Sequence, residues 1–401
     1  MTTYLNDYTN YIYQTNYTDF YNSVVRVSNQ ESYGTGALLY DGRSVLTAAH
    51  IFEGYSTDNI TVHFDAADGV QSYNAKIKIF DNYDPYNSNG DLAILTLETN
   101  PSSLYKRYDI YRDNSEIGSD FTMVGYGAYG SGNTGALDYE TELLKLKVKN
   151  SFEVDFYDID NSLKTNLSWN PLQDSILSAD FDNGEIFNDA LGVILDINDL
   201  GTGSTEGMIA SGDSGGPAFI NNLIAGIASY SASISSYSYS PDINNIIDSS
   251  FGELGAWQRV SYYSEWIDKI IREGYKNAPN SRDEVETEIL EKDDEDISYA
   301  YFLLEFLEDR DVVKENITLN YMTRDGSANA GEDYISTSGI ITLYQDESQV
   351  IIPVEVLGDN ISEGNETFYL DIVNPSYGSL GDNTTTLTAV RTIIDDDFNI
   401  A

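Results

Sequence analysis

Short runs of alternating apolar and polar residues, separated by glycine and other turn-forming residues, dominate the first two thirds of the chain. They include SVVRVS, GTGALLY, NITVHF, AKIKIF and DLAILTLE, and later DFTMVGYG, LLKLKVK, GPAFI and LIAGIASYS. A period of two residues is typical of half-buried strands. Many short strands with little helix predict an all-β sandwich or barrel.

The pattern changes to a helical period in SYYSEWIDKIIREG. This segment predicts a helix after Ser261 as N-cap and before Gly274 as stop, with one apolar face. That face holds Tyr262, Trp266, Ile267, Ile270 and Ile271. A polar stretch over 276–288 follows, which we interpret as a linker. Strand-like alternation then returns over 289–398, the size of an immunoglobulin-like sandwich.

Composition limits the possible functions of these 401 residues, which suffice for two or three domains. The chain has 66 acidic and 21 basic side chains and a net charge of −45. This balance argues against nucleic-acid binding, which needs a basic surface, and disfavours anionic membranes. It suits a salty or calcium-rich medium, in which cations screen or ligate carboxylates.

The chain has no cysteine, which excludes disulfides and thiolate metal sites. Its first residues have neither the basic nor the apolar region of a secretory signal peptide, and no apolar run is long enough to cross a bilayer. We therefore expect no membrane insertion. Three routes stay open: the protein stays in the cytoplasm, leaves without a cleaved leader, or has had its leader removed. Extracellular location by leaderless secretion is our expectation.

The segment SGDSGGP holds Ser214 between glycines, where it is either part of an inert turn or a nucleophile. A serine nucleophile needs a base, usually histidine, and a carboxylate that orients the base. Of the two histidines, His63 occupies an ordinary strand position, whereas His50 ends SVLTAAH and is the candidate base. Asp91 in NSNGDLAILTLE would cap a turn if taken alone. The order His50, Asp91, Ser214 favours a catalytic triad.

The motifs VLTAAH, DLAIL and GDSGGPAF, in that order, resemble the trypsin/chymotrypsin-like serine peptidase family, in particular its disulfide-free bacterial members. The resemblance covers about 22–275, after an N-terminal extension over 1–21. It implies two six-stranded β-barrels, a C-terminal helix and hydrolysis of protein or peptide substrates through an acyl-enzyme. His50 and Asp91 would come from the first barrel and Ser214 from the second.

The resemblance also implies an oxyanion hole and a substrate pocket. The backbone N–H groups of Gly212 and Ser214 would bind the oxyanion. Met208 would form the base of the pocket and Gly255 one wall. The substrate-facing edge would be Ser229, Tyr230 and Ser231. Because Met208 is not acidic, we expect medium-sized uncharged side chains in the pocket rather than lysine or arginine.

Asp213 occupies the position that in this family pairs with an N-terminal ammonium released by activation cleavage. The corresponding strand here begins near Val24, and no cleavage signature precedes it. Two interpretations remain: cleavage frees Val24, or Asp213 has another partner. We favour the second, with the first twenty residues as an ordered extension or a short propeptide.

The C-terminal unit has its own signature in YMTRDGSANAGEDY and TIIDDD, which resemble a Calx-β domain, a calcium-binding sandwich. Ca²⁺ takes six to eight oxygen ligands from flexible loops. The resemblance implies the following ligands: Glu291, Asp325, Asp359, Glu363, Asp395, Asp396 and Asp397. Gly358 stands where relatives often have an acid, and Asp333 could instead support its own turn. The alternative is that the DDD run is a solvated domain end.

Asp180 and Asp182 in DFDNG also hint at a calcium loop, although without visible distant ligands a surface turn is the preferred interpretation. Together these features predict an extracellular calcium-binding serine endopeptidase. The alternatives are a catalytically silent peptidase scaffold that serves as a calcium-dependent adhesin or binding protein, and a cytoplasmic peptidase activated by calcium.

Overall fold

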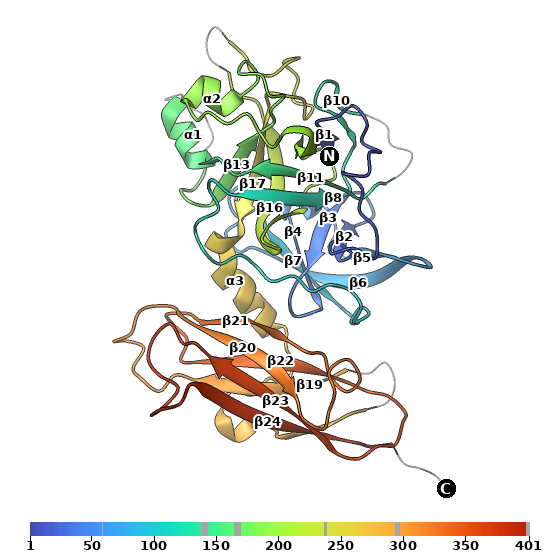
Figure 1. Ribbon diagram of the computed structural model, residues 1–401, viewed down its shortest axis with the longest axis vertical. Coiled ribbons are helices and arrows are strands. Elements are labelled where there is room, and N and C mark those ends of the chain that lie inside the picture. The colour runs from blue at the N-terminus through green and yellow to red at the C-terminus, as the bar shows by residue number, and fades with distance from the viewer. Residues whose placement is uncertain (58, 138–142, 164–169, 236–238, 293–296, 398–401) are drawn as a thin grey trace. The chain divides into compact units, whose positions relative to one another are not determined.

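The computed structural model describes residues 1–57, 59–137, 143–163, 170–235, 239–292 and 297–397. It divides the chain into two compact units, Met1–Ile271 and Arg272–Ala401. Figure 1 shows strands throughout both units, with few helices. Within the described residues, no helix is at once long enough and apolar enough to cross a membrane.

A closed six-stranded barrel forms the first half of the N-terminal unit, with strand order β2-β3-β4-β7-β6-β5. Its alternating sequences place one face of each strand inside, where Val27, Val45, Phe64 and Leu95 are fully buried. Its strands are β2 (Val24–Ser28), β3 (Tyr33–Leu38), β4 (Ser44–Thr47), β5 (Ile60–Ala66), β6 (Gly69–Ile79) and β7 (Ala93–Leu97).

The second half is a seven-stranded antiparallel sheet of order β11-β8-β15-β16-β17-β13-β12, one short strand more than the six expected. Phe121, Phe152 and Trp257 pack ring on ring in its core, with centroids 4.0 to 5.6 Å apart. Its strands are β8 (Asp120–Gly125), β11 (Leu146–Ser151), β12 (Val154–Asp155), β13 (Ile176–Asp180), β15 (Pro217–Ile220), β16 (Leu223–Ala232) and β17 (Leu254–Arg259).

The first residues of the chain pair with the segment that leads to Ser214. Strand β1 (Thr2–Thr3) runs antiparallel to β14 (Gly207–Met208) and parallel to β9 (Gly130–Ser131), and β10 (Gly135–Ala136) completes this small sheet. Met1 is 1% exposed and belongs to the core of the second half. The beginning of the expected N-terminal extension is thus ordered and integral to the unit.

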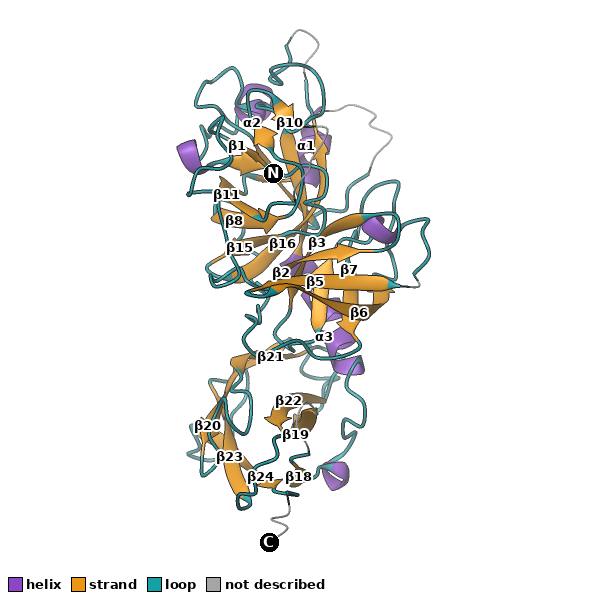
Figure 2. Cartoon of the chain, turned by 90° about the vertical axis from the view of Figure 1, so that its right-hand side faces the viewer, coloured by secondary structure: helices purple, strands orange, loops and turns teal. Residues whose placement is uncertain are grey.

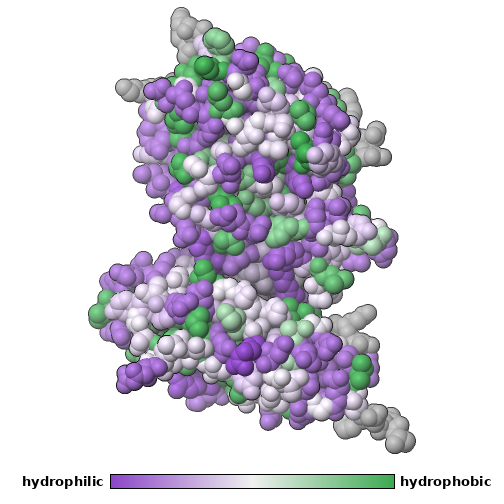
Figure 3. Space-filling model, in the orientation of Figure 1, coloured by the Kyte–Doolittle hydropathy of each residue, from purple (hydrophilic) through white to green (hydrophobic). Residues whose placement is uncertain are grey.

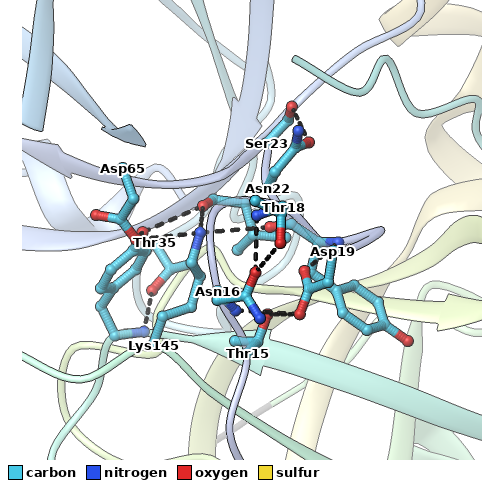
Figure 4. Close-up of polar contacts among 12 residues, drawn as sticks. Thr15, Asn16, Thr18, Asp19, Asn22, Ser23, Thr35, Asp65 and Lys145 are labelled. Carbon is cyan, nitrogen blue, oxygen red and sulfur yellow. Dashed lines mark hydrogen bonds and ion pairs between the residues drawn. The ribbon is translucent and has the colours of Figure 1, made fainter. Parts of the chain in front are cut away.

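The two halves are also joined by polar contacts around Lys145, just before β11 (Figure 4). The Lys145 ammonium lies 3.2 Å from the Asp65 carboxylate of β5 and donates to the Val24 carbonyl oxygen. Close by, Asp19 accepts hydrogen bonds from Thr15 and from the backbone of Asn16. The Lys145 contacts join the two halves, and the Asp19 contacts order the N-terminal segment itself.

The described part of the chain contains three α-helices, α1 (Phe156–Leu163), α2 (Ala190–Leu195) and α3 (Val260–Glu273). Short 3₁₀ turns occupy His50–Phe52, Gly203–Thr205 and Arg282–Glu284. The expected helix is present as α3, but two details were wrong. Tyr263, not Tyr262, is on the buried face, and the Ser261 hydroxyl donates to the buried Glu116 carboxylate instead of capping the helix.

The C-terminal unit is a β-sandwich, as predicted (Figure 2). Its five-stranded sheet has the order β18-β24-β23-β20-β21 and faces the pair β19-β22. Phe302, Val354, Phe368 and Ile393 are among the core residues between them. The strands are β18 (Glu288–Leu290), β19 (Ile297–Glu305), β20 (Ile317–Asp325), β21 (Ser338–Leu343), β22 (Gln349–Leu357), β23 (Glu366–Val373) and β24 (Thr386–Ile394). The face in Figure 3 is largely hydrophilic, in keeping with the high acidic content.

Candidate active site

Three loops bring His50, Asp91 and Ser214 together. His50 follows β4 and opens a 3₁₀ turn. Asp91 lies two residues before the start of β7, and Ser214 lies in the turn before β15. His50 Nε2 lies 2.8 Å from Ser214 Oγ, and His50 Nδ1 lies 2.7 Å from Asp91 Oδ2. The imidazole can therefore accept the hydroxyl proton while the carboxylate holds the opposite ring N–H.

The surroundings of His50 determine its basicity. Burial, the largest influence, lowers the pKa of His50, but the hydrogen bond and charge of Asp91, with a smaller contribution from Glu53, outweigh it and raise the pKa above 6.5. The other histidine, His63, lies between the hydroxyls of Ser28 and Ser72 at 2.8 Å from each. His63 is an ordinary strand residue, as expected.

Asp91 is only 2% exposed and is held by three donors. The His50 backbone N–H donates to Oδ1 at 2.8 Å, and the Ser229 hydroxyl donates to Oδ2 at 2.5 Å, beside the bond from the imidazole. Ser229, predicted at the edge of the substrate pocket, thus directs its side chain at the acid. Both contacts orient the carboxylate toward the ring.

The turn at Ser214 leaves two backbone donors available. Gly212 has φ of +91° and Gly215 of +81°, values that favour glycine. Among the described residues, no carbonyl or side chain accepts from the N–H of Gly212 or Ser214, whereas Asp213 and Gly216 donate to backbone carbonyls. These two free N–H groups match the predicted oxyanion hole.

Asp213 holds this turn from behind through a buried ion pair. Its Oδ2 lies 2.7 Å from the Met1 ammonium, and both groups are 1% exposed. Oδ2 also accepts from the Ala210 N–H at 2.9 Å, and Oδ1 from the Gly127 N–H at 2.8 Å. Asp213 therefore has a partner other than Val24, whose own N–H donates to the Tyr21 carbonyl within the chain.

The predicted pocket residues are adjacent but mostly buried. Ser231 and Gly255 lie opposite each other on β16 and β17, and Tyr230 packs on the Phe156 ring. A Cβ on Gly255 would lie 2.4 Å from the Trp257 indole and 3.1 Å from the Met208 sulfur. Because Met208 and Trp257 are completely buried, little space is left beneath Gly255.

A second group of acidic residues gathers at one end of the C-terminal sandwich. Burial, together with the nearby carboxylates of Asp359, Asp395 and Glu363, raises the pKa of Glu291 to about 7. The Asp395 carboxylate accepts from the Glu363 backbone N–H at 2.8 Å. Four of the seven predicted ligands are therefore close together.

The other predicted ligands are placed differently. Asp325 accepts hydrogen bonds from the Ala330 N–H and the Tyr334 hydroxyl, which lower its pKa and tie it to its own turn. Asp396 accepts from the Lys292 N–H, and the Asp397 N–H donates to Asp395. Sequence analysis missed Glu366, whose carboxylate lies within 4.8 Å of those of Asp333 and Glu363.

The comparisons with known families match both units. Residues 12–155 match the Trypsin family model, and residues 304–397 match the Calx-beta domain model. The match to the Trypsin model falls in the N-terminal unit, Met1–Ile271, and the match to the Calx-beta model falls in the C-terminal unit, so we call these units the trypsin domain and the Calx-beta domain. Both resemblances inferred from motifs are confirmed, as is the all-β fold class.

Curated relatives match short stretches. The chain is 36% identical over 83 residues to Adhesion G-protein coupled receptor V1 of Danio rerio, covering 20% of this chain and 1% of that protein. It is 33% identical over 61 residues to Sodium/calcium exchanger Calx of Drosophila melanogaster, and 37% over 62 residues to Sodium/calcium exchanger 3 of Rattus norvegicus. These matches cover 15% and 16% of this chain but only 6% and 7% of the exchangers.

Two solved structures are similar to part of this chain. One is the scabies mite inactivated protease paralogue S-D1, with 19% identity and a TM-score of 0.45, covering 66% of this chain and 97% of that chain. The other is neuropsin, a serine protease expressed in the limbic system of mouse brain, with 15% identity and a TM-score of 0.44, covering 62% and 94%.

Two features of the trypsin domain could not be foreseen from local sequence. No pattern in the first residues marks Met1 as the partner of Asp213, because the two meet only after the whole second sheet has formed. The hydrogen bond from Ser229 to Asp91 likewise joins distant strands. The sequence signalled this hydrogen bond only through the hydroxyl of Ser229, a polar side chain at a position predicted to border the substrate pocket.

Proposed function

We propose that the protein is a serine endopeptidase that forms an acyl-enzyme at Ser214 and carries a calcium-binding sandwich. The observation that carries this proposal is the continuous hydrogen-bonded chain from Ser214 through His50 to Asp91, with distances of 2.8 and 2.7 Å. Those are the distances at which a base can accept a proton from its nucleophile.

The reaction follows from these positions. As Ser214 Oγ attacks the carbonyl carbon of the scissile peptide, its proton passes to His50 Nε2. The C=O π pair becomes an oxyanion, which the N–H groups of Gly212 and Ser214 stabilise. The imidazolium then protonates the leaving amine as the C–N bond breaks. Water attacks the resulting ester with His50 again as base, and the acid product and free Ser214 are released.

Asp91 supports the base electrostatically rather than by accepting its proton. The carboxylate is buried and already receives hydrogen bonds from the His50 backbone and Ser229. It favours the tautomer with the proton on Nδ1 and stabilises the imidazolium.

The Calx-beta domain is proposed to bind calcium through the acidic residues that meet at its end. Glu291, Asp359, Glu363 and Asp395 lie close enough to raise the pKa of Glu291, which indicates uncompensated negative charge. Oxygen-only donors on loops suit Ca²⁺. When bound, the ion would neutralise these carboxylates and stabilise the loops, and Asp333 and Glu366 could join the ligand set.

The substrate preference follows from the buried Met208 and Trp257. Without an acid beneath Gly255 and with the indole filling that space, we propose cleavage after uncharged side chains of small to medium size. We also propose that the protein acts outside the cell, where millimolar calcium is available to the acidic domain.

Labelling with a fluorophosphonate probe tests the enzymatic proposal directly. Wild-type protein should be labelled at Ser214, and the Ser214→Ala variant should not be. Ser211→Ala, in the same turn but outside the triad, is the matched control and should be labelled. If wild-type protein and Ser214→Ala remain equally unlabelled with and without calcium, a silent scaffold with an adhesive function replaces the peptidase.

A further inference from the structure

Five acidic side chains from separate segments meet inside the trypsin domain, away from the triad. They are Glu153, Asp180, Asp182, Asp189 and Glu206. Carboxylate oxygens of Asp180, Asp182 and Asp189 all lie within 4.8 Å of one another. All three residues are buried, so the surface turn expected for DFDNG was wrong.

Several oxygens of this cluster have no hydrogen-bond donor among the residues that the structure describes. Asp180 is completely buried and Asp182 is 1% exposed, yet within this part of the chain Asp180 Oδ1 and Asp182 Oδ1 have no hydrogen-bond partner. Glu153 Oε2 is equally unpartnered. Among the described residues, no lysine or arginine forms an ion pair with any of the five. Buried charges are normally paired or bound to a metal.

The remaining oxygens are fixed by backbone donors. The Leu191 N–H donates to Asp180 Oδ2 at 2.8 Å, and the Gly192 N–H donates to Asp189 Oδ1 at 2.5 Å. Glu206 accepts from the N–H groups of Asp182 and Thr202, both at 2.7 Å. Each of these carboxylates is therefore oriented before any ion arrives.

Without a cation the cluster is electrostatically unfavourable. Burial raises the pKa of Asp182, and the charges of Asp180, Glu206 and Asp189 raise it further. Glu206 is affected in the same way, with its pKa raised to about 8. A divalent cation would remove both the repulsion and the unpaired oxygens.

We propose that Asp180, Asp182 and Asp189 form a calcium site within the trypsin domain, with Glu153 and Glu206 completing its charge. The donor set contains only oxygen, which favours Ca²⁺ or Mg²⁺ over Zn²⁺. Mg²⁺ prefers to keep several waters, whereas a buried set of protein carboxylates suits Ca²⁺. This site is separate from that of the Calx-beta domain.

The position of the site indicates its purpose. The segment from Asp182 to Glu206 connects β13 to β14, and β14 leads through Met208 to the turn at Ser214. An ion held by Asp182 at the start of this segment and Asp189 in its middle would fix the segment against the sheet, and the bond from the Asp182 N–H to the Glu206 carboxylate ties in its end. Calcium would thereby stabilise the wall of the substrate pocket in a chain that has no disulfide.

The test uses the full chain with the Calx-beta acids removed by Glu363→Gln and Asp395→Asn, so that calcium bound elsewhere can be counted. Equilibrium dialysis should find about one calcium ion per chain in this background, and calcium should raise its melting temperature. Adding Asp182→Asn should weaken binding ~10-fold or more, because a charged ligand is lost. Glu185→Gln, an exposed acid in the same segment, is the matched control and should bind normally.

Two results would overturn the site. One is a Calx-beta-substituted chain that binds no calcium at millimolar concentration and shows no calcium-dependent melting. The other is an Asp182→Asn variant whose affinity equals that of Glu185→Gln. The first needs no substitution inside the cluster, so it decides the question even if Asp182→Asn fails to fold. Neither readout depends on peptidase activity.

Discussion

The ion pair between the Met1 ammonium and the Asp213 carboxylate predicts that catalysis depends on two charges outside the triad, one of which comes from the first residue of the chain. In Asp213→Asn the carboxylate becomes an amide of nearly the same shape, so the turn before Ser214 loses its charge partner but little volume. The Met1 ammonium is then left 1% exposed without an anion. The new amide N–H₂ also faces the Ala210 or Gly127 N–H, where an acceptor stood before.

The size of the effect follows from burial. Removing one partner of a buried ion pair costs about 3–5 kcal/mol. If the loss destabilises the ordered turn by this amount, most molecules will no longer have the conformation in which the N–H groups of Gly212 and Ser214 face the substrate. Since each 1.36 kcal/mol is about a factor of ten, kcat/KM should fall about 10²- to 10⁴-fold.

The assay is steady-state hydrolysis of a peptide substrate, with the rate of fluorophosphonate labelling as a second readout. A chain with one glycine added before Met1 is a parallel perturbation, because it keeps Asp213 but converts the ammonium to an amide. Asp41→Asn, a buried turn aspartate that accepts from Ser44, is the control and should keep full activity. If Asp213→Asn and the extended chain both retain wild-type kcat/KM, the ion pair does not hold the turn.

Three further predictions concern the triad, the oxyanion hole and the Calx-beta domain. Asp91→Asn should lower kcat about 10⁴-fold with little change in KM. Because Asp91 raises the pKa of His50 above 6.5, the wild-type rate should fall on acidification at a midpoint above that pH, and the midpoint should move to lower pH in any residual activity of the variant. Gly212→Ala should lower kcat about 10²- to 10³-fold, since its φ is +91° and its Cβ would lie 2.9 Å from the Tyr33 ring; wild-type turnover would contradict the assignment of the oxyanion hole. Calcium at about 100 times its dissociation constant should stabilise the Calx-beta domain by about 2.7 kcal/mol, and Glu363→Gln should reduce this gain in denaturant titrations; equal gains in both proteins would exclude Glu363 as a ligand.

The sequence was most informative where chemistry and local pattern coincide. The strands, the helix and the sandwich and barrel classes could be predicted from periodicity and motif order, because periodicity and motifs are properties of residues that are neighbours in the sequence. The triad was predicted from an inventory of only two histidines and from the motif SGDSGGP around Ser214. His50, Asp91 and Ser214 accordingly lie within hydrogen-bond distance of one another.

What the sequence did not reveal depends on distant segments meeting. The buried cluster draws Glu153 from between β11 and β12, and Asp180 from the end of β13. Asp182 and Asp189 come from the connection that follows, and Glu206 comes from its end, just before β14. Only the two aspartates of DFDNG were visible as a local pattern. Tyr262 was placed on the buried helix face, but Tyr263, Ile267 and Ile271, spaced four residues apart, form that face, because the packing partners of the helix decide which stripe is covered.

The division of the triad between the two halves of the trypsin domain has a mechanical consequence. His50 and Ser214 come from different halves, so their 2.8 Å separation depends on contacts between the halves, such as the Thr35 N–H donating to the Ser214 carbonyl and the Lys145 ion pair with Asp65. A relative slip of one or two ångströms would separate base from nucleophile while every strand remained folded. We therefore expect thermal inactivation to precede loss of β-sheet circular dichroism, and heated samples to recover turnover on cooling until the sheets themselves melt.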